Sequence, residues 1–199
     1  MVSIIIMPLR FMPWVGNTLV EEEEGAKQTL CMNNLIELIE YNTWANKRIL
    51  SQVKSLAQKD LIKDTDGCFA SLRHAIIHLL RSDWIWLDRW LGQDFVEIPE
   101  QWNDLMIEDI QSIWSAVQAN IIDLLKSKLV EEADELITIS NEGEYKLMLE
   151  LRKTINLVVN HGAYHRGQIV NTIKMLGLQP IKTQLLEYYR RRREFKIIL

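Results

Sequence analysis

All four histidines of the chain fall into two pairs with the spacing H-x-x-x-H. His74 and His78 form one pair, and His161 and His165 form the other. Residues four apart on a helix differ by about 40° of rotation, so both imidazoles of a pair face the same way. Two such rings can share one metal ion, and a third imidazole from another helix would complete a three-ligand site. Three neutral imidazoles leave a coordination position open for water or substrate, which is typical of catalytic metal sites.

The same spacing also suits a plain polar helix face. His74 and His78 share a stripe with Ser71 and Arg81, and the later pair shares its face with Gln168. Both stripes could equally be solvent-exposed, because polar side chains in water need no partner within the protein. Periodicity therefore leaves two interpretations open, a metal site and a solvated surface.

Two glycines, Gly162 and Gly167, lie inside the segment that carries the second histidine pair. Each costs about 1 kcal/mol relative to alanine in an exposed helix interior. Glycine also lets another backbone or side chain approach a helix closely, because it has no β-carbon. The two glycines are therefore consistent with close helix approach around a site.

Hydrophobic periodicity predicts the elements that would carry these residues. Apolar side chains recur at spacings of three and four, which is typical of amphipathic helices. Ser71 suits the N-cap of one helix, and Gly92 suits its C-terminal stop. A short last helix is expected at about 182–193. The four long helices are expected at about residues 33–56, 72–91, 105–126 and 149–176.

Two segments between the long helices are expected to have other structures. Residues 93–103 contain Pro99 and can run from one end of a bundle to the other, since extended chain reaches roughly 3.3 Å per residue. Between Leu136 and Met148 apolar side chains alternate, which predicts a short hairpin. The sequence therefore predicts an all-α fold: a four-helix bundle with a long crossover connection, a short hairpin before the last long helix, and a short C-terminal helix.

Residues 1–31 do not share the helical pattern. They contain Pro8, Pro13 and the acidic run Glu21–Glu24, and no period is sustained. We interpret this stretch as an N-terminal extension that can be disordered, and residues 32–199 as the bundle domain. A flexible arm, a small added element and an early start codon all fit the stretch.

Composition limits the expected partners and location. The 199-residue chain is 48% hydrophobic, with a formal net charge of -4, so neither nucleic acid nor an anionic membrane is expected to bind it. The basic turn Arg190–Arg193 has acidic neighbours and is better explained as a solvated helix end. No apolar run reaches the roughly 18–20 residues that span a bilayer, and no signal-peptide cleavage site follows the first stretch. Cys31 and Cys68 suit free thiols in the cytoplasm.

Three segments of the chain resemble the DinB/YfiT-like metalloenzymes, a family of four-helix bundles. The first is Tyr41–Asn46 (YNTWAN), and the second runs from Ser71 to Trp86. The third, Val159–Gln168 (VNHGAYHRGQ), is the most specific, because its histidines, glycines, arginine and glutamine all fall in the family's order. The resemblance covers the chain from about Met32 to the C-terminus. One departure is that Thr183 is followed by glutamine, where the family commonly has aspartate.

The resemblance implies that His78, His161 and His165 are the metal ligands. In the family pattern the ligand on the second helix stands seven residues after the serine, which here selects His78. His74 then becomes a surface residue or a residue that supports a ligand. The metal that the resemblance implies is zinc or nickel. Three imidazoles do not distinguish these ions, because geometry and availability decide which one is bound.

Other polar residues near the ligands are candidates for supporting roles. Asn46 and Gln168 could orient bound water or substrate, although a plain surface amide fits each equally well. Asp83 points about 140° away from His78 on a helix, so it receives no direct role. Arg166 is expected to form a salt bridge. Three tryptophans are attributed to core packing: Trp44, Trp84 and Trp86.

Characterised members of this family include thiol S-transferases and a thiol-dependent isomerase. The resemblance therefore implies an enzyme whose metal binds a low-molecular-weight thiol as the thiolate, which attacks a small-molecule substrate. With water in the open position, the same site would be that of a hydrolase. The alternative is a non-enzymatic, metal-stabilised binding or stress-response module. Such a module could form a homodimer through an apolar helix face. No residue is assigned as catalytic.

Overall fold

The computed structural model describes residues 16–64, 69–93, 97–128, 130–141 and 145–193. Two of its elements, Glu100–Asp104 (η1) and Val130–Asp134 (η2), are short 3-10 helices. In chain order the elements are α1 (Gly16–Lys54), α2 (Gln58–Leu61), α3 (Leu72–Trp90), η1 (Glu100–Asp104), α4 (Ile107–Ser127), η2 (Val130–Asp134), β1 (Leu136–Asn141), β2 (Tyr145–Glu150), α5 (Leu151–Met175) and α6 (Leu185–Arg192).

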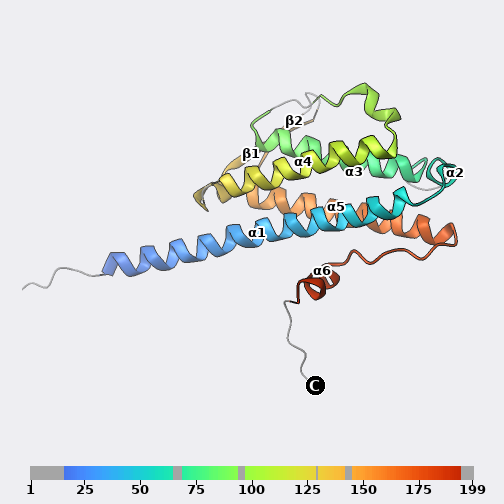
Figure 1. The fold of residues 1–199 in the computed structure, drawn as a ribbon. Helices are drawn as coiled ribbons and strands as arrows, with labels where there is room; N and C mark the ends of the chain where they lie inside the picture. Colours follow the sequence, from blue (N-terminus) through green and yellow to red (C-terminus); the bar gives the residue numbers. More distant parts are fainter. Residues whose placement is uncertain (1–15, 65–68, 94–96, 129, 142–144, 194–199) are drawn as a thin grey trace, which may run out of the picture.

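Four long helices, α1, α3, α4 and α5, form the predicted bundle (Figure 1). α1 packs against α4 and α5, and α3 packs against the same two helices, so α1 and α3 lie diagonally across the bundle from each other. The chain between α3 and α4 runs back along the bundle (Figure 1), so these two helices point in the same direction. The all-α bundle with a long crossover connection is confirmed.

Local sequence signals set where α3 begins and ends. The Ser71 hydroxyl accepts a hydrogen bond from the His74 backbone N–H at 3.3 Å, which satisfies one of the free donors of the first turn. At the other end Gly92 has a φ of +84°, a conformation that glycine adopts without steric cost. The Gln93 N–H then donates back to the carbonyl of Asp88 at 3.0 Å, which completes a Schellman ending. These two signals place one of the histidine-bearing helices.

Large apolar side chains from all four helices fill the bundle interior. Ile49 of α1, Ile76 of α3, Trp114 of α4 and Ile155 of α5 are each at most 1% exposed. Burying one aliphatic side chain of this size stabilises the fold by about 1.5–3 kcal/mol. The core therefore sets how each helix is rotated toward its neighbours, and thereby which polar faces meet.

The predicted hairpin is present as the antiparallel strands β1 and β2. Ile137 lies opposite Leu149, and Ile139 lies opposite Leu147. Ile137 is buried whereas its neighbour Leu136 is exposed, as expected for side chains that alternate across a strand. β1 contacts α3 and α5, and β2 contacts α5, so the hairpin packs beside the two helices that carry the histidines.

α1 begins at Gly16, well before the predicted start at Asn33. That predicted start was wrong, and residues 16–31 are helical. The stretch lacks an apolar period, yet Glu21–Glu24 and the following Ala, Lys, Gln and Leu residues have high intrinsic helix propensity. Figure 1 shows that this end of α1 extends beyond the other bundle helices. The predicted boundary after residue 31 therefore falls inside a helix, and residues 1–15 lie outside the described part of the chain.

The predicted last helix is present as α6, which together with the segment before it lies along α1. The Tyr41 hydroxyl donates to the Thr183 carbonyl at 3.1 Å, and the Gln52 side-chain amide donates to the Gln179 carbonyl at 2.8 Å. The rings of Tyr41 and Tyr188 pack edge to face with their centres 5.8 Å apart. These contacts attach the C-terminal segment to the outer side of the bundle.

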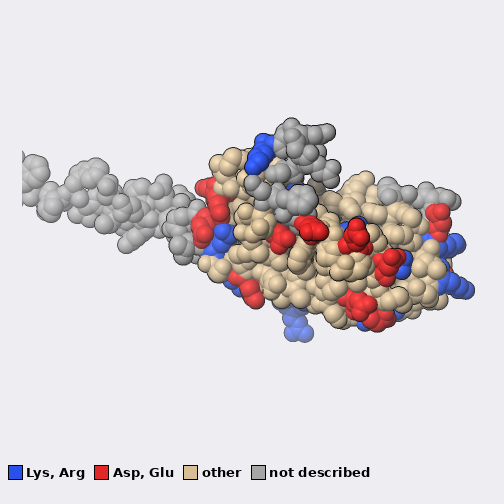
Figure 2. Space-filling view, turned by 90° about the horizontal axis from the view of Figure 1, so that it is seen from above, with Lys and Arg blue, Asp and Glu red and all other residues tan. Residues whose placement is uncertain are grey.

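Acidic and basic side chains are interspersed on the face drawn in Figure 2. In the basic helix α6, Arg191 pairs with Glu187 at 3.1 Å, and Arg192 pairs with Glu40 at 3.5 Å. Part of the basic charge at this end is thus balanced by nearby carboxylates. Among the helices that the structure describes, none has an apolar stretch long enough to cross a lipid bilayer.

Candidate metal centre

Three imidazole nitrogens converge between α3 and α5. His78 Nε2 lies 3.2 Å from His161 Nε2 and 3.1 Å from His165 Nε2. α3 and α5 pack directly against each other, and His161 and His165 stand one turn apart on α5, so both reach the same side. His74 lies outside this cluster: it is exposed, and its Nδ1 is 3.0 Å from the Ser71 hydroxyl.

The spacing of these nitrogens fits a single divalent ion. Nitrogens at about 2.1 Å from one ion stand about 3.0 Å apart at right angles and about 3.4 Å apart at the tetrahedral angle. The two measured separations, 3.2 and 3.1 Å, fall within this range. Within the part of the chain that the structure describes, no Asp, Glu or Cys joins the cluster. An all-imidazole donor set suits zinc, nickel, copper or iron better than calcium or magnesium.

The environment of the cluster favours the uncharged form of two of its rings. Burial lowers the pKa of His161 to about 4, and the neighbouring His165 and His78 contribute to this shift. Burial is also the largest cause of the lowered pKa of His78, followed by the charges of His165 and Arg81. Both values lie below the ordinary imidazole pKa of about 6.5. These rings are therefore neutral at pH 7, as metal binding requires.

Gln168 holds the third ring in place. Its side-chain oxygen Oε1 lies 2.7 Å from His165 Nδ1. With this oxygen as acceptor, Nδ1 carries the proton and donates it to the hydrogen bond, so Nε2 keeps its lone pair for the cluster. Partners of this kind set the tautomer and the orientation of a ligating imidazole.

Replacing Gln168 by leucine is expected to weaken metal binding by about 10–100-fold, the usual effect of removing such a partner. The cause is the loss of the hydrogen bond to His165, which frees the ring to rotate and to change tautomer. Competition with a chromogenic chelator measures the affinity. Gln111→Leu is the matched control, since Gln111 is an exposed glutamine on α4. Equal affinities of the two variants would contradict a role for Gln168.

Aromatic side chains border the histidine cluster. The ring centre of Phe69 lies 5.1 Å from that of His78 and 5.2 Å from that of His165. The ring of Tyr164 lies 5.0 Å from His165. Apolar groups around a metal site limit the access of water and lower the local dielectric constant. Phe69 and Tyr164 both flank the His165 ring, so they are placed to limit the access of water to it.

A hollow of about 490 Å³ opens beside His161. α3 and α5 form its walls, and His161 belongs both to this hollow and to the cluster of three imidazoles. A molecule in the hollow would therefore lie next to the cluster. Six side chains line it: Ser82, Trp86, Leu157, Asn160, His161 and Tyr164.

The sequence pattern of a known protein family matches most of the chain. The match to the DinB family covers residues 30–194. The chain belongs to the DinB family. The protein is also similar to Protein DinB of Bacillus subtilis (strain 168), with 26% identity over 148 residues, which are 71% of this chain and 85% of that protein.

Solved structures of DinB-like proteins share the bundle. A DinB-like protein from Bacillus cereus ATCC 10987 superposes with a TM-score of 0.57 at 14% identity, covering 73% of this chain and 94% of that one. A DinB-like protein from Bacillus subtilis superposes with a TM-score of 0.55 at 11% identity, covering 74% of this chain and 97% of that one. At these identities the likeness shows the fold, which agrees with the family assignment.

The DinB bundle of this protein also contains a buried polar cluster, whose members come from all four long helices. Arg166, which follows the ligand candidate His165, is 1% exposed. Its Nη1 donates to the Oδ1 atoms of Asn42 and Asn46, each at 2.6 Å. Within the described residues these amides take the place of the predicted salt bridge. The members of the cluster are Asn42, Asn46, Asp83, Trp114, Gln118 and Arg166.

Asp83 is the acidic member of the buried polar cluster. Its Oδ2 accepts hydrogen bonds from Trp114 Nε1 at 2.6 Å, Gln118 Nε2 at 3.3 Å and Asn46 Nδ2 at 3.4 Å. Burial raises the pKa of Asp83 to about 6, and these hydrogen bonds and the charge of Arg166 oppose the rise. Asp83 thus connects α3 to α1 and α4 and makes these contacts away from the histidines.

Gly162 makes room for this cluster. A β-carbon at position 162 would lie 2.5 Å from Asn42 Oδ1 and 2.7 Å from Arg166 Nη1, closer than side-chain atoms can approach. The close approach to this helix that the two glycines were consistent with is therefore found at Gly162, where the side chains of Asn42 and Arg166 lie against the backbone. At Gly167 a β-carbon would meet nothing within 4 Å, so no neighbour in the described structure explains that glycine.

The two proposed supporting residues lie in different places. Gln168 contacts His165 directly, whereas the hydrogen bonds of Asn46 go to Arg166 and Asp83. Asn46 therefore acts at most through its neighbours. Its place in the interior could not be read from the helix surface pattern, because the pattern does not show which helix packs on which.

Apart from His161, the residues that line the hollow were not assigned to a site from the sequence. Trp86 packs against the core as predicted, but it is half-buried and also forms part of the wall. A periodic signal was present: Trp86 stands eight residues after His78, on the same helix face. Likewise Leu157 and Tyr164 stand four residues before and three residues after His161. Trp84 also packs against the core as expected.

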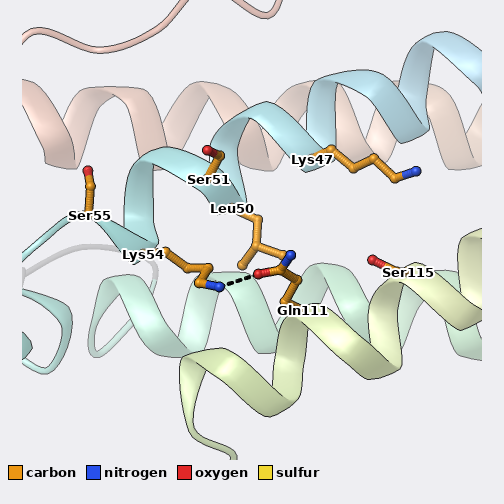
Figure 3. A pocket seen from close by; sticks show the side chains of 7 residues that line it. All are labelled: Lys47, Leu50, Ser51, Lys54, Ser55, Gln111 and Ser115. Atoms are coloured by element: carbon orange, nitrogen blue, oxygen red, sulfur yellow. Dashed lines mark hydrogen bonds between the residues drawn. The ribbon is translucent and has the colours of Figure 1, made fainter.

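A second hollow, of about 620 Å³, lies between α1 and α4 (Figure 3). In it the Lys54 ammonium donates to Gln111 Oε1 across the gap between the two helices (Figure 3). Neither α1 nor α4 carries a histidine, so this hollow is separate from the candidate metal centre. Its lining residues are Lys47, Leu50, Ser51, Lys54, Ser55, Gln111 and Ser115.

Proposed function

We propose that His78, His161 and His165 bind one divalent ion, zinc or nickel, and that the protein is a metal-dependent enzyme for a small-molecule substrate. The reaction is of the thiol S-transferase or hydrolase type. The observation that carries this proposal is the convergence of three imidazole nitrogens, from two helices, beside a hollow of about 490 Å³. Three ligands leave a coordination position open, which is typical of catalytic metal sites.

The residues of the chain have separable tasks in this proposal. A divalent ion supplies Lewis acidity, which lowers the pKa of a coordinated thiol or water. Gln168 keeps the proton of His165 on Nδ1 and so directs Nε2 toward the cluster. Phe69 covers the rings of His78 and His165 and limits the access of water. His161 faces the hollow, where the substrate would enter.

A second candidate function is a non-enzymatic binding or stress-response module that the metal stabilises. One observation favours it. His78 lies on α3 and the other two ligands lie on α5, so an ion would link two helices of the bundle. An ion that binds only the folded chain adds its binding free energy to stability. Removing the metal would then destabilise the fold without abolishing a reaction.

A panel of thiols tests the enzymatic proposal. With monochlorobimane as the electrophile, we expect product formation above the uncatalysed rate with at least one of glutathione, cysteine and coenzyme A. Turnover should disappear after chelation and return when zinc or nickel is added, because the ion is needed to form the nucleophile. Turnover of p-nitrophenyl acetate without thiol would identify a hydrolase. Protein that holds one ion per chain but turns over neither substrate would favour the non-enzymatic module.

A further inference from the structure

The hollow beside His161 is lined by uncharged side chains. Ser82, Trp86, Leu157, Asn160 and Tyr164 carry no formal charge at neutral pH. The guanidinium carbon of Arg89 stacks over Trp86 at 5.0 Å from the ring centre, and Arg89 is not part of the lining. A carboxylate or phosphate bound against this wall would give up part of its hydration without meeting an opposite charge among the lining side chains.

Three large apolar surfaces dominate the hollow. Leu157 and Tyr164 of α5 are 45% and 63% exposed, and Trp86 of α3 is half-buried. Leu157, His161 and Tyr164 follow one another on one face of α5, since they are spaced by four and three residues. Exposed apolar side chains that line a concave site are typical of small-molecule binding, where aromatic walls take up rings.

Two neutral polar groups add direction to this surface. The hydroxyl of Ser82 and the amide of Asn160 line the same hollow, and each can both donate and accept a hydrogen bond. Such groups can orient a carbonyl, hydroxyl or amide of a ligand without requiring a charge on it. The polar end of a bound molecule would therefore be fixed while its apolar part contacts the walls.

We propose that the hollow binds the uncharged, ring-bearing part of the substrate and presents it to the metal centre at His161. This proposal rests on the proposed function, because it assigns the substrate class of the same site. The uncharged lining selects against carboxylates and phosphates, and the apolar walls of Trp86, Leu157 and Tyr164 select for a ring.

Binding of benzamide and benzoate to the full chain tests this proposal, since the two probes share a ring and differ in charge. Incorporated 5-fluorotryptophan reports the binding, and Trp86→Phe identifies the resonance of Trp86. Titrations use chelator-treated protein, so that a carboxylate cannot bind the ion. We expect benzamide to shift the Trp86 resonance and benzoate to bind at least about tenfold more weakly, a difference of about 1.4 kcal/mol.

A matched pair of variants locates the binding site. Leu157→Asp places a carboxylate in the lining and is expected to weaken benzamide binding by about tenfold or more. Leu147→Asp makes the same change at a leucine of β2 that is 46% exposed and lies outside the hollow, and it should leave binding unchanged. Equal affinity of the two probes, or unchanged binding in Leu157→Asp, would overturn the proposal.

The same experiments separate this inference from the proposed function. If the chain binds benzamide at Trp86 but holds no divalent ion after reconstitution, the ring-binding hollow is supported and the proposed metal-dependent enzyme is contradicted. If the protein holds one ion per chain but benzamide does not shift the Trp86 resonance, the metal centre is supported and the proposed substrate class is contradicted.

Discussion

His161→Ala is expected to remove the metal from the protein. The wild type should carry close to one divalent ion per chain, and the variant should lose most of it during dialysis. The reason is that two imidazoles remain where three are needed to hold the ion. The loss of affinity should exceed the about 10–100-fold effect of removing a residue that only supports a ligand. Elemental analysis of the purified and dialysed proteins measures the result.

His74→Ala is the matched control, since it removes the exposed histidine of the H-x-x-x-H pair on α3. Its metal content should equal that of the wild type, because its ring lies against Ser71 and outside the cluster. Loss of the ion from this variant would show that the wrong member of the pair has been assigned. If the wild type holds no stoichiometric metal, either as purified or after reconstitution, the proposed metal centre is wrong.

Arg166→Met is expected to lower the free energy of unfolding by about 3–5 kcal/mol. Arg166 is buried and donates to Asn42 and Asn46, and its positive charge acts on the carboxylate of Asp83. Removing one member of a buried charged network leaves the remaining charge without compensation, and this accounts for most of the loss. Urea denaturation followed by circular dichroism, in chelator-treated protein, gives the free energy without a contribution from metal binding.

Two further variants show whether burial of the charge is the cause. Arg191→Met removes an exposed arginine that pairs with Glu187, and it should change stability by less than about 1 kcal/mol. Arg166→Lys keeps the positive charge but loses the guanidinium geometry, so it should fall between the wild type and Arg166→Met. A loss in Arg166→Met no larger than in Arg191→Met would contradict the structural role of the buried polar cluster.

The ionisation of Asp83 should appear in the dependence of stability on pH. Its pKa in the folded protein, about 6, lies above its ordinary value of 3.8. A carboxyl of this kind stabilises the fold while it is protonated, so its contribution is complete below about pH 4 and is lost as pH rises through 6. The two values differ by about two units, which corresponds to about 3 kcal/mol. Asp83→Asn, which cannot ionise, should lack this loss.

Comparing the wild type with Asp83→Asn across about pH 4–7 isolates the contribution of Asp83 to the free energy of unfolding. His78 and His161 have a lowered pKa in the folded protein, so their contribution is lost in the opposite direction, as pH falls. Both proteins share these histidines, and the difference between their free energies of unfolding cancels the contribution. Parallel curves for the two proteins would show that Asp83 does not titrate in this range.

The ends of the helices followed from local sequence. Ser71 caps α3, Gly92 ends it, and Gly177 has the positive φ that ends α5. Such signals act within a few residues, through hydrogen bonds to free backbone groups and through the freedom of glycine. The same is true of the hairpin, where alternating side chains between Leu136 and Met148 indicated strands. The start of α1 was missed, because high helix propensity extends a helix without leaving an apolar period.

The partners of each polar helix face did not follow from local sequence. Asn46 and Asp83 lie on different helices, and their meeting in the interior depends on how α1 and α3 are placed relative to α4 and α5. The pattern that predicts core packing for Trp86 does not show that the same side chain also lines a hollow. The periodicity of one helix shows which of its residues share a face, but it carries no information about what that face meets.

What the sequence alone determined is that His161 and His165 project to the same side, because the rotation between residues four apart is a property of the helix itself. Helix geometry leaves open whether His74 or His78 meets them. The family resemblance selects His78, and only the tertiary structure shows that His78 does meet them and that Arg166 turns inward beside them. The physical reason is that the rotation of α3 relative to α5 is set by the packing of apolar side chains from the whole bundle, whose contacts join residues far apart in the chain.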